Sequence, residues 1–383
     1  MRARELVHVI LNTQKIQLHI VTGNVVQEPI PTLPLTYEKS GLRVFSLETL
    51  KSVADLSGLG QVYEVSNRIA GRSDRPHSFI LACATGPINE GTFNVDKLIT
   101  GNGIEIRTES FGNKNDEPLL LIMGAGGAGV YWQDNLIQRL LDAGRFVVRY
   151  DNRDTGKSTC FDFTKEPYSL EDMAADAIAV LDAYGIERAD IAGASMGGMI
   201  SQVLMINHPH RLKTATLIMS SPLSGGGETP TLGSDDLPGP DPAWMEKMIQ
   251  LAMNIPEDRD AAIEQKVVQF GMLAGSAEPY DAEAVRKIAA IEFDQARNLA
   301  ASANHSLAIG ATTLSDRRPL LRNTNVPTLV IHGTEDPILP YPHGVALAQT
   351  IPGAELLTLD KGGHDMPECY LDEMISKMQV LWA

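Results

Sequence analysis

The part of the sequence that follows residue 95 predicts a mostly parallel, doubly wound α/β sheet. Short apolar runs alternate there with patterns of helical period, and the run at 119–123 ends in glycine, as buried parallel strands do. The alternation is interrupted once, from about residue 221 to 325, by a polar loop followed by helical patterns. We therefore expect an α/β core of residues 93–220 and 326–383, with residues 221–325 inserted as a helical cap.

Local signals place the individual elements. Gly101-Asn102-Gly103 is a hairpin signal between strands at 96–100 and 104–111. Ser169 and Asp172 resemble a capping box, and Gly185 stops the helix that they begin. The other expected strands are 146–150, 190–192, 214–220, 328–333 and 355–359, the other core helices are 133–143, 196–207 and 366–381, and the cap helices are 244–253, 261–273 and 281–301.

Residues 1–92 differ in composition from the rest of the chain. They show no persistent helical or strand period, and no methionine occurs between Met1 and Met123. Residues 1–95 hold 9 Lys and Arg against 8 Asp and Glu, whereas the whole chain holds 32 against 48. We interpret 1–92 as an N-terminal extension of unknown structure, either poorly ordered or translated upstream of the natural start. A small accessory domain is the third interpretation.

Composition excludes several classes of function. The 383 residues are 43% apolar, which suffices for a packed core, and the formal net charge is −16. Because lysine and arginine do not cluster, nucleic acid is not an expected partner. The spacing of the three cysteines matches no metal motif, and no apolar stretch reaches the roughly 18 residues of a membrane span. His8 and Asn12 interrupt the apolar start, so we expect no signal peptide and a cytoplasmic protein.

The sharpest motif is Gly193-Ala194-Ser195-Met196-Gly197, between an expected short strand and an expected long helix. This is the setting in which a tight turn projects a serine oxygen beyond the edge of a sheet, with glycines on either side leaving room for it. The helix behind the serine directs its dipole and free N–H groups toward developing negative charge. We therefore expect Ser195 to be a nucleophile.

A nucleophilic serine needs a base and an acid that orients the base. His364 follows Gly362-Gly363 in a loop after the last expected strand, where an imidazole can reach the serine. The expected acid is Asp336, in the loop that follows the strand 328–333. Glu335 is the neighbour best placed to replace it, and Asp365 would need a strained fold-back onto His364.

Two backbone donors are expected for the oxyanion of an acyl-transfer intermediate. One is the N–H of Met196, which follows the nucleophile. The other lies in the glycine-rich turn at residues 124–129, and we expect it to be the N–H of Ala125. A dinucleotide site is the alternative for this turn, but no clear ribose-binding acid follows it. Tyr131 and Trp132 either line the substrate pocket or pack in the core, and residues 151–158 are expected to form a supporting turn.

From about residue 95 to its end, the chain resembles the α/β-hydrolase superfamily, and within it aclacinomycin methylesterase and its esterase relatives. The likeness rests on Met123-Gly124 followed by Trp132, on the stretch 149–158 and on the Ser-Met-Gly of the elbow. It implies a triad of Ser195, Asp336 and His364, in the order usual for that fold, with oxyanion donors at Ala125 and Met196. The sequence departs from the family in the many glycines at 124–129, the long polar loop that begins the cap, and residues 1–92.

The expected function is a serine carboxylesterase that hydrolyses small to medium apolar esters and needs no metal or organic cofactor. C–C bond hydrolases, enol-lactonases and cofactor-free haloperoxidases carry similar elbows and are the alternatives. A non-catalytic, receptor-like member of the fold is an alternative of another class, although such proteins often lack a triad residue. We expect a small-molecule ester as partner, with no nucleic acid and no membrane, and the sequence leaves the oligomeric state open.

Overall fold

The computed structural model describes residues 95–224, 237–252, 256 and 258–383, together with four strands among the first 82 residues. The chain divides into two compact units, Met1–Glu90 and Gly91–Ala383. Most of the polar loop expected at the start of the cap, residues 225–236, lies outside the described residues.

The first unit contains a four-stranded antiparallel sheet. The order of its strands is β3-β2-β1-β4. In β2, the apolar residues Ile16, Leu18 and Ile20 alternate with polar ones, which is typical of a strand even though no such period extends over residues 1–92. The strands are β1 (Leu6–Asn12), β2 (Lys15–Thr22), β3 (Val25–Val26) and β4 (Ser78–Ala82).

The second unit is built on an eight-stranded sheet of order β12-β11-β10-β9-β7-β8-β6-β5. The six strands from β12 to β8 are parallel, and β6 and β5 are antiparallel additions at one edge. This confirms the mostly parallel, doubly wound sheet. The strands are β5 (Val95–Gly101), β6 (Ile104–Phe111), β7 (Glu117–Ile122), β8 (Arg145–Tyr150), β9 (Ala189–Ala194), β10 (Leu212–Ile218), β11 (Thr328–Gly333) and β12 (Glu355–Leu359).

The hairpin between β5 and β6 follows directly from its sequence. Gly101 pairs with Ile104, so Asn102 and Gly103 alone form the turn. Their φ angles are 49° and 78°. A two-residue hairpin turn with positive φ at both positions is the geometry for which Asn-Gly is favoured.

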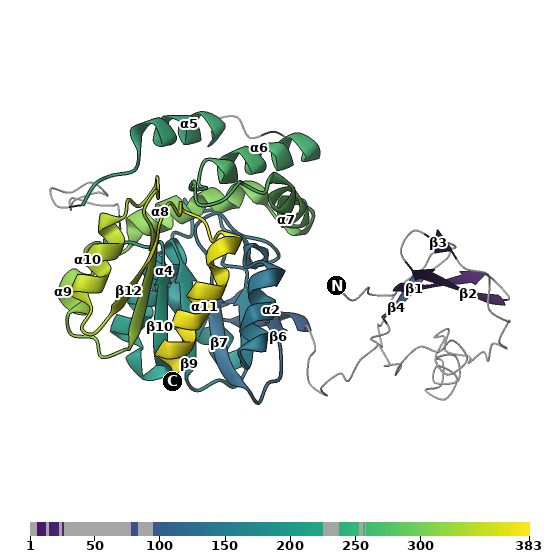
Figure 1. Ribbon diagram of the computed structural model, residues 1–383, viewed down its shortest axis with the longest axis horizontal. Helices are drawn as coiled ribbons and strands as arrows, with labels where there is room; N and C mark the ends of the chain where they lie inside the picture. The colour runs from purple at the N-terminus through teal and green to yellow at the C-terminus, as the bar shows by residue number, and fades with distance from the viewer. Residues whose placement is uncertain are drawn as a thin grey trace. The chain divides into compact units, whose positions relative to one another are not determined.

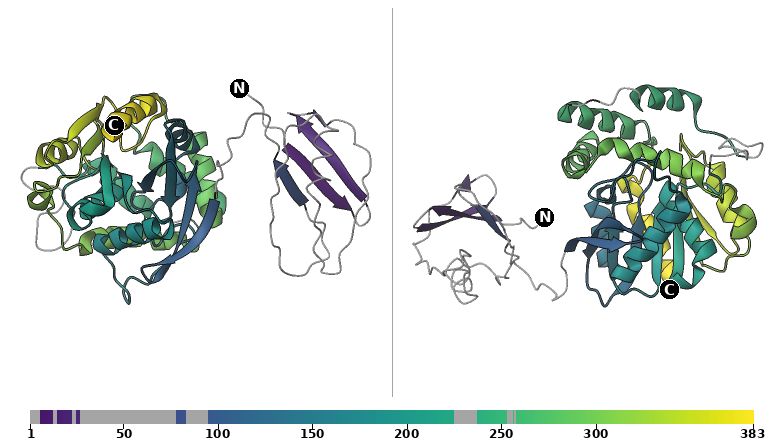
Figure 2. Two further views of the ribbon diagram at one scale, coloured as in Figure 1. Left: turned by 90° about the horizontal axis from the view of Figure 1, so that it is seen from below. Right: turned by 180° about the vertical axis from the view of Figure 1, so that it is seen from behind.

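Helices cover both faces of the sheet (Figure 1). One hydrophobic core lies between the sheet and helices α3, α4 and α10, and a second lies between the sheet and helices α2 and α11. Figure 2 shows the two helical layers from below and from behind. The helices are α2 (Asp134–Asp142), α3 (Leu170–Ala183), α4 (Met196–Asn207), α9 (Arg318–Leu321), α10 (Pro342–Thr350) and α11 (Glu368–Trp382), with 3-10 turns η1 (Gly129–Tyr131) and η2 (Pro209–Arg211).

Among the described residues, five helices, α5 to α9, lie between β10 and β11. Of these, α5, α6 and α7 lie together beyond one end of the sheet (Figure 1). The helix expected at 281–301 ends earlier, because Ala296 is extended, with ψ 131°. The chain then forms a 3-10 turn and a separate helix that packs against α3. These elements are α5 (Pro242–Ala252), α6 (Arg259–Gly271), α7 (Ala282–Gln295), η3 (Leu299–Ala303) and α8 (Asn304–Ala311).

Candidate active site

Ser195 lies on a strained turn between β9 and α4. Its φ and ψ are 54° and −117°, a conformation that is costly for any residue with a side chain. Side chains added at the flanking glycines would collide with backbone atoms. A Cβ at Gly193 would meet the backbone of Gly197, and a Cβ at Gly197 would meet the backbone of Ile122. Glycine at both positions is therefore a steric requirement of this turn.

The neighbouring strand β10 holds the turn in place. The N–H of Ser195 donates to the carbonyl oxygen of Ile218 over 2.8 Å, and the hydroxyl of Ser220 donates to the carbonyl oxygen of Ser195 over 2.9 Å. Met196 begins α4, so its N–H has no acceptor one turn earlier within the helix. The nucleophile candidate thus stands on a rigid support beside an open backbone donor.

Asp336 and His364 form a hydrogen-bonded pair. Nδ1 of His364 lies 2.7 Å from Oδ2 of Asp336, which is buried. The other carboxylate oxygen accepts the N–H groups of Ile338 and Leu339, over 2.9 and 2.8 Å. With Nδ1–H donating to Asp336, Nε2 is the nitrogen left to exchange a proton.

The environment of Asp336 favours its charged form. Burial by itself raises the pKa of the carboxyl, but the charge of His364 and the hydrogen bonds from His332 and His364 outweigh burial and hold the pKa well below its usual range. The lowered pKa favours the carboxylate form of Asp336, which accepts the hydrogen bond from Nδ1 of His364.

The other candidate acids bond elsewhere. Both carboxylate oxygens of Glu335 accept from Ser276, from the N–H over 2.8 Å and from the hydroxyl over 3.0 Å. Asp365 accepts the N–H of Gly363 over 3.1 Å. His332 also lies close to Asp336, at 3.4 Å, but its Nε2 is 2.6 Å from the carbonyl oxygen of Leu339 and its side chain is fully buried.

Parallel pairing brings Ser195, Asp336 and His364 to one edge of the sheet. They follow β9, β11 and β12, respectively. Strand β10 pairs in parallel with β9 as far as Ala194 and with β11 as far as Ile331, and β11 pairs with β12 as far as Leu359. Among the described residues, His364 bonds to Asp336 and not to Ser195. Catalytic hydrogen bonds are often long without substrate and tighten when it binds.

The glycine-rich turn (residues 124–129) follows β7 at the same edge, and acceptors from three places hold it. The N–H of Gly126 donates to Nδ1 of His305 over 2.9 Å, and the N–H of Ala128 donates to Oε1 of Glu292 over 3.1 Å. The N–H of Gly129 donates to Oδ1 of Asp151 over 2.9 Å. Between these tethered residues and the sheet lies Ala125, which is exposed.

Tyr131 and Trp132 are both buried in the same hydrophobic core, but their contacts differ. The Tyr131 ring stacks on Phe270 of α6 with 4.7 Å between ring centroids, and its hydroxyl donates to Glu292 over 2.8 Å. Burial, followed by the charge of Glu292, raises the pKa of Tyr131 well above its usual value. Trp132 is 1% exposed and lies in the core beneath α2 and α11. That burial favours packing over pocket lining for Trp132.

Residues 151–158 form the supporting turn that their sequence indicates. Asn152 donates to the carbonyl oxygen of Met123 over 2.9 Å, just before the glycine-rich turn. Asp154, whose φ is 68°, accepts from Tyr168 and from Asn304 of α8, over 2.5 and 3.0 Å. This segment therefore links the glycine-rich turn to the helices that follow β10.

Sequence reasoning missed Glu292 and His305, whose side chains are 4% and 0% exposed. Glu292 lies on α7 beside other carboxylates of that helix, such as the exposed Glu283, and no local pattern distinguishes the two. Their hydrogen bonds to the glycine-rich turn join residues 164 and 179 positions apart in the chain.

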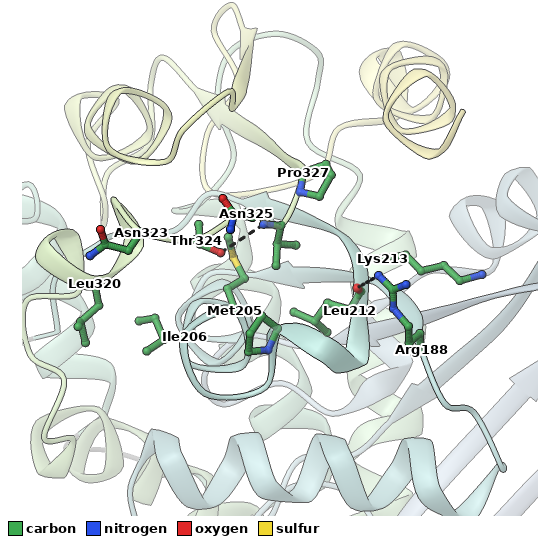
Figure 3. Close-up of a pocket in the computed structure, with 12 residues that line it drawn as sticks. Arg188, Met205, Ile206, Leu212, Lys213, Leu320, Asn323, Thr324, Asn325 and Pro327 are labelled. Carbon is green, nitrogen blue, oxygen red and sulfur yellow. Dashed lines mark hydrogen bonds between the residues drawn. The ribbon is translucent and has the colours of Figure 1, made fainter.

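A surface cleft of about 350 Å³ lies at the opposite edge of the sheet, away from these residues. The end of α4, the start of β10 and the segment before β11 line it, and Arg188 is held there by the carbonyl oxygen of Leu212 (Figure 3). Because α/β sheets bind ligands at the carboxyl ends of their strands, the candidate active site is the edge that carries Ser195.

Known proteins share both the sequence and this architecture. Residues 117–368 match the family model described as the alpha/beta hydrolase fold. The chain belongs to the α/β-hydrolase family. It is 33% identical to rhodomycin D methylesterase DnrP of Streptomyces peucetius over 281 residues, which cover 71% of this chain and 92% of that one. The family match and the similarity to this methylesterase together show that the chain is a hydrolase.

Solved structures show the same fold. An enol-lactonase from Burkholderia xenovorans LB400 has a TM-score of 0.58 at 23% identity, covering 74% of this chain and 99% of that one. The esterase RhEst1 from Rhodococcus sp. ECU1013 has a TM-score of 0.60 at 21% identity, covering 75% and 98%.

Two further findings concern only the part of the chain that the structure describes. No helix there combines the length and apolar character needed to cross a membrane. No group of three or more His, Cys, Asp or Glu side chains there is arranged to hold a metal ion.

Proposed function

We propose that the protein is a serine carboxylesterase in which Ser195, His364 and Asp336 form the catalytic triad. The observation that carries this proposal is the 2.7 Å bond between His364 and a buried, ionised Asp336, at the sheet edge where Ser195 occupies a strained turn. Hydrolysis of ester bonds is the chemistry that the methylesterase relatives support.

The reaction proceeds through an acyl-enzyme. The Ser195 oxygen attacks the ester carbonyl carbon while Nε2 of His364 takes the hydroxyl proton, and Asp336 stabilises the resulting imidazolium. The tetrahedral intermediate then expels the alcohol, which receives the proton from His364. Water, deprotonated by His364, attacks the acyl carbon and releases the carboxylic acid and Ser195.

The N–H groups of Ala125 and Met196 are proposed to bind the oxyanion. Met196 carries the first N–H of α4, so the helix dipole adds to its effect. In the glycine-rich turn, Gly126, Ala128 and Gly129 already donate to side chains, which supports Ala125 as the second donor.

The proposed substrate is a small to medium apolar ester. The net charge of −16 gives no attraction to anionic substrates, and the stacked Tyr131 and Phe270 place apolar surface beside the glycine-rich turn. The proposed chemistry uses no metal and no organic cofactor. The cysteine pattern supports our proposal of a reducing, cytoplasmic compartment.

The test is hydrolysis of p-nitrophenyl esters with short to long acyl chains by wild type and Ser195→Ala, with Ser302→Ala as the control. Within the part of the chain that the structure describes, the Ser302 hydroxyl bonds locally, to the carbonyl oxygen of Leu299. We expect Ser195→Ala to lose about 10⁴-fold or more of kcat and the control to match wild type. Wild-type activity in Ser195→Ala would overturn the nucleophile assignment.

The same assay decides between ester hydrolysis and the alternatives. If folded wild type hydrolysed lactones or dienone C–C bonds but no ester, the triad would serve those reactions instead. Peroxide-dependent halogenation would indicate a haloperoxidase. Ligand binding by Ser195→Ala without any turnover by wild type would indicate the receptor-like class.

A further inference from the structure

The glycine-rich turn has little means of fixing its own shape. Four of its six residues are glycine, so they lack side chains that could pack or bond, and glycine has the greatest backbone freedom of any residue. An oxyanion donor, however, must be fixed in direction before the reaction begins. Contacts from residues outside the turn must therefore fix the direction of its N–H groups.

His305 of α8 supplies one constraint. Its Nδ1 accepts the N–H of Gly126 over 2.9 Å, and its Nε2 lies 2.7 Å from the carbonyl oxygen of Arg153. A carbonyl oxygen can only accept, so Nε2 carries the proton and Nδ1 is the free acceptor. Burial lowers the pKa of His305, which keeps this neutral form.

Glu292 of α7 supplies the second constraint. One carboxylate oxygen accepts the N–H of Ala128 over 3.1 Å, and the other accepts the hydroxyl of Tyr131 over 2.8 Å. Lys266 of α6 lies 3.2 Å from the same carboxylate and donates to the carbonyl oxygen of Gly126 over 3.4 Å. The carboxylate is thus bonded on both oxygens and paired with a cation.

We propose that Glu292 and His305 are positioning residues that fix the glycine-rich turn so that the N–H of Ala125 is directed at the oxyanion. This proposal rests on the proposed function. The two side chains hold the N–H groups of Gly126 and Ala128, the residues that follow Ala125, and they leave that of Ala125 for the substrate. The helices inserted after β10 are then part of the catalytic apparatus as well as a cover for the site.

Neither side chain can act on the substrate directly. His305 is fully buried with both nitrogens engaged, and Glu292 is 4% exposed with both oxygens engaged. Their effect must therefore pass through the turn. Loss of either acceptor leaves an N–H of the turn without its partner, buried in the case of Ala128 and partly buried in the case of Gly126, and the turn is then free to rotate that group elsewhere.

Paired variants separate this role from simple packing. His305→Asn and Glu292→Gln keep an acceptor near the original atom, whereas His305→Leu and Glu292→Met keep volume without one. We expect the apolar variants to lose roughly 10-fold to 100-fold in kcat with little change in KM, because loss of a whole oxyanion donor costs about 10²–10³-fold. The amide variants are expected to retain most of kcat. Glu283→Gln, on the exposed side of α7, is the control and is expected to match wild type.

A coupling measurement identifies Ala125 as the donor concerned. Ala125→Pro removes its N–H, and we expect His305→Leu to reduce kcat much less in that background than in wild type. Equal losses in both backgrounds, equal losses in the amide and apolar members of each pair, or a change in KM alone would overturn the proposal.

Hydrogen exchange of the turn tests the proposal without any substrate. In His305→Leu and Glu292→Met we expect faster exchange of the backbone N–H groups of Gly126 and Ala128. In His305→Asn and Glu292→Gln we expect the exchange of α8 and α7 to be unchanged. Unchanged exchange of the turn in the apolar variants would overturn the proposal even if Ser195 were not the nucleophile. If His305→Leu did not fold, the Glu292 pair and Ala125→Pro carry the same comparison.

Discussion

The nucleophile turn and the glycine-rich turn lie at the same sheet edge, but they are held in different ways. The Ser195 turn is held by close backbone packing: added side chains at Gly193 and Gly197 would collide with backbone, and the backbone of Ser195 itself bonds to Ile218 and Ser220. The glycine-rich turn is fixed from a distance, by His305, Glu292 and Asp151. The nucleophile turn thus depends on close backbone packing, and the glycine-rich turn depends on hydrogen bonds to side chains from outside it.

The largest expected effect is on the proton-transfer pair that both turns serve. Asp336→Asn is expected to lower kcat by about 10⁴-fold, because an amide no longer stabilises the imidazolium or selects the Nδ1–H form of His364. Glu335→Gln, one residue earlier, is the control and is expected to stay near wild type because Glu335 bonds to Ser276. Steady-state kinetics with a p-nitrophenyl ester measures both, and an equal loss in the two variants would contradict our choice of acid.

A second prediction compares alanine in the two turns. Gly197→Ala places a Cβ against the carbonyl oxygen of Ile122, and we expect it to lower the free energy of unfolding by about 3 kcal/mol or more. A Cβ at Gly126 meets no atom of the described residues within 4 Å, and for Gly126→Ala the φ of 73° gives an expected loss of about 1 to 2 kcal/mol. Urea unfolding measures both, and a larger loss at Gly126 would reverse the contrast between close backbone packing and side-chain tethers.

The smallest expected effect is a pH dependence of stability caused by His305, which accepts the N–H of Gly126. Burial lowers the pKa of His305 in the folded chain, while the unfolded chain titrates at about 6.5. The contribution of neutral His305 to the free energy of unfolding is therefore complete above pH 6.5. It is lost as the pH falls below that value, because the unfolded state then binds a proton that the folded state does not. Arg153 and Asp154 are the charged groups that act on this imidazole, and Asp154 offsets part of the shift.

Thermal melting from pH 7 to pH 5 checks this dependence. We expect the melting temperature of His305→Asn to fall less over that interval than that of wild type. His208→Asn is the comparison, because His208 also has a lowered pKa but lies nearer the surface. An identical fall in wild type and His305→Asn would show that the tether does not titrate in this range.

The sequence by itself determined the elements whose signals are local. The hairpin at Asn102-Gly103, the capping box at Ser169 and the strand, turn and helix around Ser195 depend on residues a few positions apart, where sterics and hydrogen bonding are set by the chain itself. The parallel order of the sheet then followed from the alternation of strands and helices, which places the loops bearing Asp336 and His364 beside Ser195.

Only the tertiary structure decided how the glycine-rich turn is held. Glu292 lies in a helix whose pattern indicates a helical segment and nothing more, and the end of that helix at Gln295 was not apparent from its period. His305 lies in α8, a helix that was not expected from the sequence. The physical reason is that a glycine has no side chain, so the residue type does not indicate which groups its backbone will bond to. Two of the three side-chain acceptors for the turn, His305 and Glu292, lie more than 160 positions away in the sequence, and folding alone brings them to the turn.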